Sequence, residues 1–147
     1  KKEIMISIFK DVRNELVKER ERITNSQEYK ADEKLYKFLC MHVKYLIANK
    51  EITILLFSEA AHMNDPQLKK HLREILSIQK EFLRRIIKQG IEEGIWNEDI
   101  DTEDAAILYM GIPISLNIEL VLNPKFFIKE KFCESMILLM EKALKKK

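Results

Sequence analysis

The sequence has few residues of the kinds that form tight turns, with three Gly and three Pro among 147. β-Sandwiches, barrels and Gly-rich phosphate loops depend on such residues, so the composition argues against all three. The glycines are Gly90, Gly94 and Gly111, and their spacing forms neither a Walker loop, nor a dinucleotide loop, nor a Gly-x-Ser-x-Gly turn. We therefore expect no catalytic residues and no enzymatic activity.

Neither sign of charge predominates. Lys plus Arg number 26 and Asp plus Glu number 24, which gives a formal net charge of +2. A domain that binds nucleic acid usually carries a much stronger basic surface. This chain by itself is not expected to bind DNA.

Cysteine is also scarce. The two cysteines, Cys40 and Cys133, lie far apart in the sequence and belong to no cluster with the spacing of metal ligands. This usage is typical of a reducing compartment and argues against a disulfide scaffold.

Long hydrophobic runs are missing as well. The longest stretch without a charge covers residues 105–118 and contains Gly111 and Pro113. A bilayer span needs about 20 mostly apolar residues, and the start of the chain has no signal-peptide pattern. We therefore predict a soluble, cytoplasmic protein with no membrane-spanning helix. The chain also lacks an initiator Met, so we expect that an upstream segment is missing.

What the sequence does contain is helical periodicity over nearly its whole length. We predict an all-α fold, a bundle of about six helices that forms a single domain over residues 1–147. Asp65 followed by Pro66 is a helix-start signal, and Pro113 should kink the helix that contains it. The expected helices cover residues 2–24, 32–48, 51–62, 66–89, 101–122 and 124–144.

The last two expected helices, 101–122 and 124–144, carry more apolar surface than one buried stripe requires. A monomer would leave much of it exposed, whereas a symmetric dimer would bury it in a four-helix interface. The alternative is that both helices lie at the centre of a monomeric core. For the dimer, the expected interface residues are Ile107, Ile114, Ile118, Val121, Phe132, Met136, Leu139 and Met140.

Several polar residues interrupt otherwise apolar stripes, most clearly His42, Gln79 and Glu59. A buried polar group without a hydrogen-bond partner costs about 1–3 kcal/mol. These residues therefore indicate either an internal polar network or a mostly apolar pocket with a few polar anchors; taken singly, each is more typical of plain core. The candidate ligand-binding residues are Phe38, His42, Tyr45, Phe57, Glu59, Gln79, Phe82 and Tyr109.

One tetrapeptide has the spacing of a metal-binding motif. Glu59 and His62 match the Glu-x-x-His pair of di-iron bundles, in which two such pairs are needed. The sequence contains no second pair. We therefore predict no metal site and no cofactor.

The order of these features resembles that of tetracycline-repressor-type (TetR/AcrR) transcriptional regulators. The strongest similarity is the stretch 65–96, with Asp65-Pro66 at its start and Gly90-Ile-Glu-Glu-Gly94-Ile-Trp96 at its end. Residues 101–111, 55–60 and 1–5 resemble other helices of the regulatory domain in that family. The similarity covers nearly the whole chain, but the helix-turn-helix headpiece that should precede residue 1 is absent.

The resemblance implies the effector-binding and homodimerisation domain of a one-component transcriptional regulator, and we expect a repressor. It implies three partners: a second copy of the chain, a small and largely apolar effector, and operator DNA contacted only through the absent headpiece. The helix at residues 2–24 would transmit the effector signal. The alternative is a stand-alone helical module that binds a small molecule or a protein and has no role on DNA.

Overall fold

The computed structural model describes residues 2–55, 64–123 and 125–146, and these form an all-α bundle, as predicted. The complete helices are α1 (Lys2–Asn25), α2 (Ala31–Ala48), α4 (Pro66–Glu92), α5 (Thr102–Leu122) and α6 (Phe132–Leu144). Residues 50–55 are helical too. In the described part of the chain the sole β pairing is an isolated bridge between Trp96 and Lys145.

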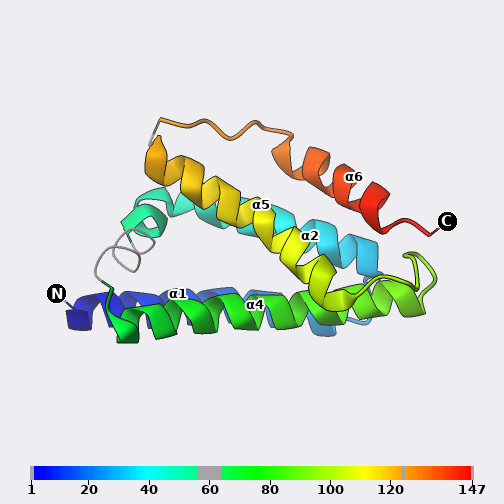
Figure 1. Cartoon of the computed structure of the whole chain (residues 1–147), viewed down its shortest axis with the longest axis horizontal. Helices are drawn as coiled ribbons and strands as arrows, with labels where there is room; N and C mark the ends of the chain where they lie inside the picture. The colour runs from blue at the N-terminus through cyan, green and yellow to red at the C-terminus, as the bar shows by residue number, and fades with distance from the viewer. Residues whose placement is uncertain (1, 56–63, 124, 147) are drawn as a thin grey trace.

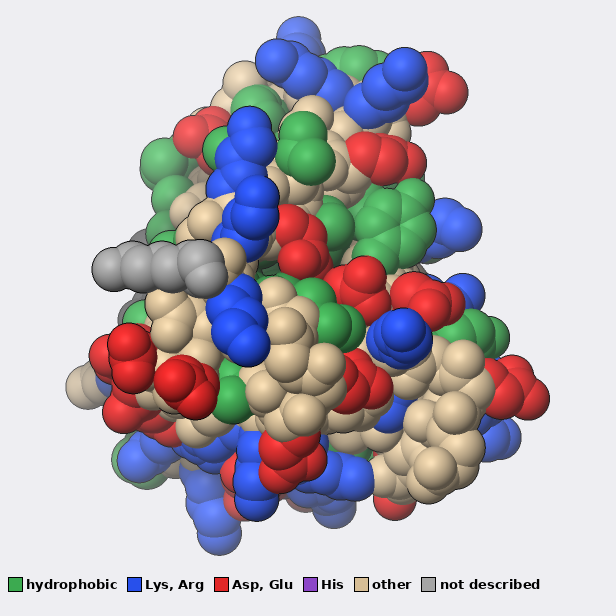
Figure 2. Space-filling model, turned by 90° about the vertical axis from the view of Figure 1, so that its right-hand side faces the viewer, with side chains coloured by type: hydrophobic (Ala, Val, Ile, Leu, Met, Phe, Trp, Pro, Cys, Tyr) green, Lys and Arg blue, Asp and Glu red, His purple; other side chains and the backbone are tan. Residues whose placement is uncertain are grey.

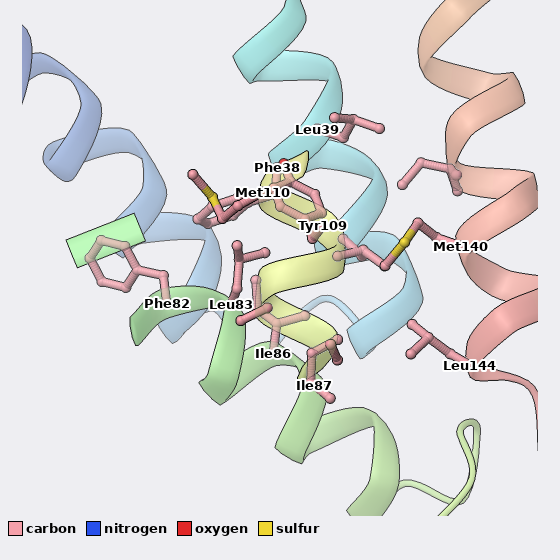
Figure 3. Packing of buried hydrophobic residues seen from close by; sticks show 14 of the residues in the cluster. Phe38, Leu39, Phe82, Leu83, Ile86, Ile87, Tyr109, Met110, Met140 and Leu144 are labelled. Carbon is pink, nitrogen blue, oxygen red and sulfur yellow. The ribbon is translucent and has the colours of Figure 1, made fainter. Parts of the chain in front are cut away.

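The helices form two layers around one core. The long helices α1 and α4 lie side by side, and α5 and α2 cross over them (Figure 1). Helix α6 packs chiefly against α2 on the outside of the second layer. The main hydrophobic cluster joins α2, α4, α5 and α6, with Phe38, Leu83, Tyr109 and Met140 pointing toward one another (Figure 3). A second, smaller cluster lies between α1 and α4.

The helix starts follow the local sequence. Asp65 accepts hydrogen bonds from the backbone N–H groups of Gln67 (2.8 Å) and Leu68 (3.3 Å), which confirms it as the N-cap of α4. Asp101 does the same for Glu103 and Asp104 at the start of α5. Helix α5 continues through Pro113.

The loop after α4 holds α6 in place. Gly94 has a φ of +75°, a conformation that favours glycine. Gly90 lies so close to the indole of Trp96 that a Cβ would come within 2.0 Å of the ring. The buried Trp96 then donates from Nε1 to Glu141 at 2.9 Å, and the Asn97 N–H donates to the Leu144 carbonyl. The Gly-x-x-x-Gly-x-Trp sequence thus fixes where α6 ends.

The predicted helix at 124–144 is too long at its start, because α6 begins at Phe132. The N–H groups of Lys125 and Phe126 bond back to the side chain and carbonyl of Asn123, which turns the chain. Phe126 and Ile128 are then half-buried against the core while Phe127 is exposed. This alternation is typical of extended chain.

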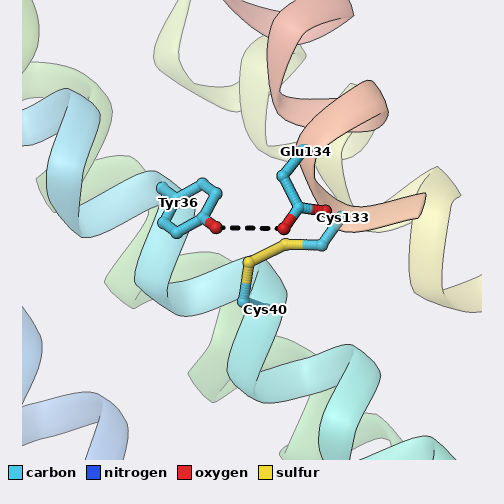
Figure 4. Close-up of a disulfide and its surroundings, with 4 residues drawn as sticks. All are labelled: Tyr36, Cys40, Cys133 and Glu134. Carbon is cyan, nitrogen blue, oxygen red and sulfur yellow. Dashed lines mark hydrogen bonds between the residues drawn. A yellow bond between two sulfur atoms is a disulfide. The ribbon is translucent and has the colours of Figure 1, made fainter. Parts of the chain in front are cut away.

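The expectation that the cysteines stay unpaired is wrong. Cys40 on α2 and Cys133 on α6 form a disulfide, with Cα atoms 5.5 Å apart. The bond lies at the α2–α6 contact, beside the hydrogen bond from the Tyr36 hydroxyl to Glu134 (Figure 4). Sequence spacing could not reveal the pair, because 93 positions separate the two residues and only helix packing brings them together.

Helix α5 is long and apolar enough to cross a membrane by length and composition, although the sequence analysis predicted no such helix. Of its most apolar window, 39% is buried inside the protein. A core helix of a soluble protein passes the same test, so this is weak evidence for a membrane span.

Seen from the end at which α6 finishes, acidic and basic side chains are interspersed over the surface (Figure 2).

Candidate functional site

A mostly apolar cavity of about 80 Å³ lies between α1, α2, α4 and α5. The space exceeds what one water molecule needs several-fold. Its apolar wall is built by Phe9 and Leu16 of α1, Leu72 of α4, and Met110 and Ile114 of α5. The polar groups at the cavity are contributed by His42, Tyr45, Thr53, Gln79 and Asn117. Each of these four helices turns one face toward the interior, and the cavity lies where these faces meet.

The structure brings together three of the predicted ligand-binding residues. His42 and Tyr45 lie one turn apart on α2, and Gln79 faces them from α4. Polar residues within otherwise apolar helix faces, such as His42 and Gln79, were therefore the sequence feature that indicated this cavity.

Three other predicted ligand-binding residues are core residues and do not line the cavity. The ring of Phe38 packs edge-on against both Phe82 and Tyr109, with centroids 6.3 Å apart in each pair. All three side chains are buried. This aromatic cluster belongs to the main hydrophobic core. Phe57 and Glu59, together with His62 of the considered metal motif, lie outside the described residues.

Sequence reasoning missed Asn117 as a cavity residue and assigned Ile114 to the dimer interface. Both lie on the face of α5 that lines the cavity, and Ile114 is half-buried there. Asn117 is a polar residue on an apolar helix, the same signal that identified Gln79. Pro113 and Met110 complete this face of α5.

Several polar atoms around the cavity have no hydrogen-bond partner among the residues that the structure describes. They are His42 Nδ1, Gln79 Oε1 and Asn117 Oδ1, and the buried Tyr109 hydroxyl is in the same state. Burial, with a contribution from the nearby Arg20, lowers the pKa of His42 well below its usual range. The imidazole is therefore neutral. Groups in this state can bond to a bound molecule.

Sequence reasoning also missed Arg20, which lies beside the cavity and stands four residues after Leu16 and three before Ile23 of the apolar face of α1. It is only 1% exposed, on a helix that otherwise looks amphipathic. Its guanidinium lies over the ring of Phe38, 5.2 Å from the centroid. In the described part of the chain no three His, Cys, Asp or Glu side chains gather in a way that could hold a metal ion.

Several of the residues expected at a dimer interface are exposed on the outer faces of α5 and α6. Ile107, Ile118 and Leu139 are exposed by 56%, 47% and 59%. Leu108, Leu122 and Leu138 are exposed on the same two helices. Val121, Phe132 and Met136 are half-buried.

Met140 is the clear exception among these residues. It is 4% exposed and packs inside the main cluster (Figure 3), so its assignment to the interface is wrong. The apolar arc of α6 is broad enough to have one buried side and one exposed side. The side that contains Met140 packs against α2.

Comparison with known proteins adds two findings. A family model described as tetracyclin repressor-like, C-terminal domain, matches residues 28–116, which is more than half of the chain. Among solved structures, the MbdR regulator from Azoarcus sp. CIB superposes with a TM-score of 0.83 at 18% sequence identity, over 97% of this chain and 76% of that one. At this identity the likeness shows the fold alone. No curated protein matches the sequence significantly.

Proposed function

Because the chain belongs to the tetracyclin repressor-like C-terminal domain family, we propose that it is the effector-binding and dimerisation domain of a one-component transcriptional regulator. The observation that carries the proposal is the cavity between α1, α2, α4 and α5, with its apolar wall and unsatisfied polar atoms. A small, largely apolar effector with a few polar atoms fits that lining. Such a regulator would act in the cytoplasm.

The second half of the proposal is a homodimer built on α5 and α6. The exposed positions of α5 follow one stripe that includes Ile107, Gly111, Ser115 and Ile118. The two small residues would let a partner helix approach closely, and a Cβ at Gly111 would meet nothing within 4 Å. Leu138 and Leu139 extend the apolar surface onto α6. A twofold axis would let this surface pair with itself.

The cavity and the proposed interface share α5, which couples them. Ile114 and Asn117 face the cavity, while Ile107 and Ile118 face outward on the same helix. An effector that fills the cavity would press on α1 and α5 together. In a longer chain with a DNA-reading segment ahead of α1, that pressure would change the spacing of two such segments on operator DNA. Couplings of this kind are about 1–3 kcal/mol, or roughly 5- to 150-fold in operator affinity.

The first test is the mass of the chain in solution, by sedimentation equilibrium over a range of concentrations. We expect a dimer of 17.5 kDa chains. Replacing Ile118 and Leu139 together with Glu should raise the dimer dissociation constant by about 30-fold or more, because it places charges at the centre of the interface. The control is Ile4→Glu, which replaces an exposed apolar residue near the start of α1. A monomer at every concentration would contradict the proposed interface.

A further inference from the structure

Arg20 is a buried cation for which the described part of the chain supplies no carboxylate. Its Nη1 donates to the backbone carbonyl of Leu16 at 3.3 Å. Its Nε and Nη2 atoms are buried and have no hydrogen-bond partner in residues 2–55, 64–123 and 125–146. A guanidinium keeps its charge at any pH a protein tolerates, and a buried charge is costly unless it is paired. Among the described residues, the charge of Arg20 is therefore left without a compensating carboxylate.

The neighbours of Arg20 soften this cost but do not remove it. The face of the Phe38 ring offers a cation–π contact. Burial raises the pKa of the Tyr109 hydroxyl, so this phenol is neutral and is no counter-ion. His42 is neutral as well, because its pKa is lowered. The single positive charge of Arg20 thus dominates this part of the interior.

Arg20 lies next to the cavity. Leu16 and Gln79 line both the cavity and the narrow seam between α1 and α4 in which Arg20 lies. His42 and Tyr45, which line the cavity, are close enough to feel the charge of Arg20. A molecule in the mostly apolar cavity would therefore lie close to a cation that does not itself line the cavity.

The two unpartnered donors have a definite geometry. Nε and Nη2 lie side by side on one edge of the planar guanidinium, and this edge matches the two oxygens of a carboxylate. We propose that the effector is a carboxylic acid with an apolar body, bound with its carboxylate on the Nε–Nη2 edge of Arg20. This inference rests on the proposed function, since it takes the cavity to be the effector site.

The position of Arg20 in the seam between α1 and α4 also indicates how binding of the carboxylate would move α1. The seam around Arg20 has no room for a water-sized atom. The carboxylate can therefore reach Arg20 only if the side chain turns toward the cavity or α1 shifts away from α4. Either change acts on α1, while the apolar body of the acid presses on α5 from within the cavity. A neutral effector would lack the charge attraction that drives the change.

The test compares matched ligands that differ only in the head group. Straight-chain carboxylates from butanoate to decanoate, with the corresponding primary amides and alcohols, are titrated into the full chain by isothermal calorimetry. We expect the best carboxylate to bind at least ten times more tightly than its amide and alcohol. Arg20→Met should abolish that preference, and Arg20→Lys should keep part of it. Arg22→Met is the matched control, since Arg22 lies on the same helix, is exposed and pairs with Glu19.

The outcomes separate the two claims. If amides or alcohols bind as well as the carboxylates, the anionic class is wrong and the effector site stands. If no ligand of the three series binds, this inference fails, while the proposed dimer, which the mass measurement tests, is unaffected. If Arg20→Met does not fold, as judged by circular dichroism, the preference of the wild-type chain and its retention in Arg20→Lys decide the question.

Discussion

His42 illustrates how one buried side chain links the site to stability. It is enclosed at the cavity wall, and burial together with Arg20 lowers its pKa well below the ordinary value of 6.5. The folded state therefore binds fewer protons than the unfolded state once the pH falls below about 6.5. Stability should accordingly be highest above that pH and decline as the solution becomes more acidic.

The first prediction is that His42→Leu makes unfolding less sensitive to acid. Between pH 6.5 and 5 the free energy of unfolding of the wild type should lose up to about 1.4 kcal/mol per pH unit through this group. The variant should lose that contribution and keep the dependence that comes from other groups. Urea unfolding at a series of pH values measures the difference. Equal slopes in the two proteins would mean that His42 becomes charged in the folded state.

Arg20 and His42 also show why single residues are hard to assign from sequence. Both are polar residues on amphipathic helices, and only His42 lies in the middle of an apolar stripe. Arg20 has a long side chain that could equally have reached solvent. Its burial depends on how α1 packs against α2 and α4, which no local pattern records.

At the scale of elements, α6 is held to the bundle by a small number of specific links. They are the Cys40–Cys133 disulfide, the hydrogen bond of Trp96 to Glu141, and the bond from the Asn97 N–H to the Leu144 carbonyl. The disulfide closes a long loop, and such a bond stabilises mainly by limiting the unfolded chain. Because disulfides are rare in a reducing cytoplasm, the redox state of this pair should affect how firmly α6 is held.

The second prediction is that reduction with dithiothreitol lowers the free energy of unfolding by about 2–4 kcal/mol. The double variant Cys40→Ala, Cys133→Ala should have the lower stability in both oxidised and reduced buffer. Chemical denaturation with and without the reductant provides the measurement. A thiol assay that finds two free thiols in the oxidised, denatured chain would show that the pair does not form.

For the whole molecule, the exposed apolar surface of α5 and α6 decides the oligomeric state. If this surface is buried in a dimer, dissociation accompanies unfolding and the apparent stability depends on protein concentration. A monomer would show no such dependence. This concentration dependence is independent of the mass measurement, because it reports on the coupling of folding to association.

The third prediction is that the thermal unfolding midpoint of the wild type rises with protein concentration over the range in which dimers form. In the Ile118→Glu, Leu139→Glu double variant, the midpoint should be lower and should not change with concentration. Differential scanning calorimetry at several concentrations gives both quantities. If the thermal unfolding midpoint of the wild type does not change with concentration and its solution mass is that of a monomer, the proposed dimer interface is wrong.

The sequence by itself determined the fold class, the helix starts at Asp65 and Asp101, and the position of His42, Tyr45 and Gln79 at one cavity. These features depend on periodicity and capping, which act over a few residues. Tertiary structure alone decided the Cys40–Cys133 bond, the extended segment before α6, and the burial of Arg20 and Met140. Each of these depends on which helix packs against which. A broad apolar arc, such as that of α6, has several faces that could be buried, and only the packed bundle selects one of them.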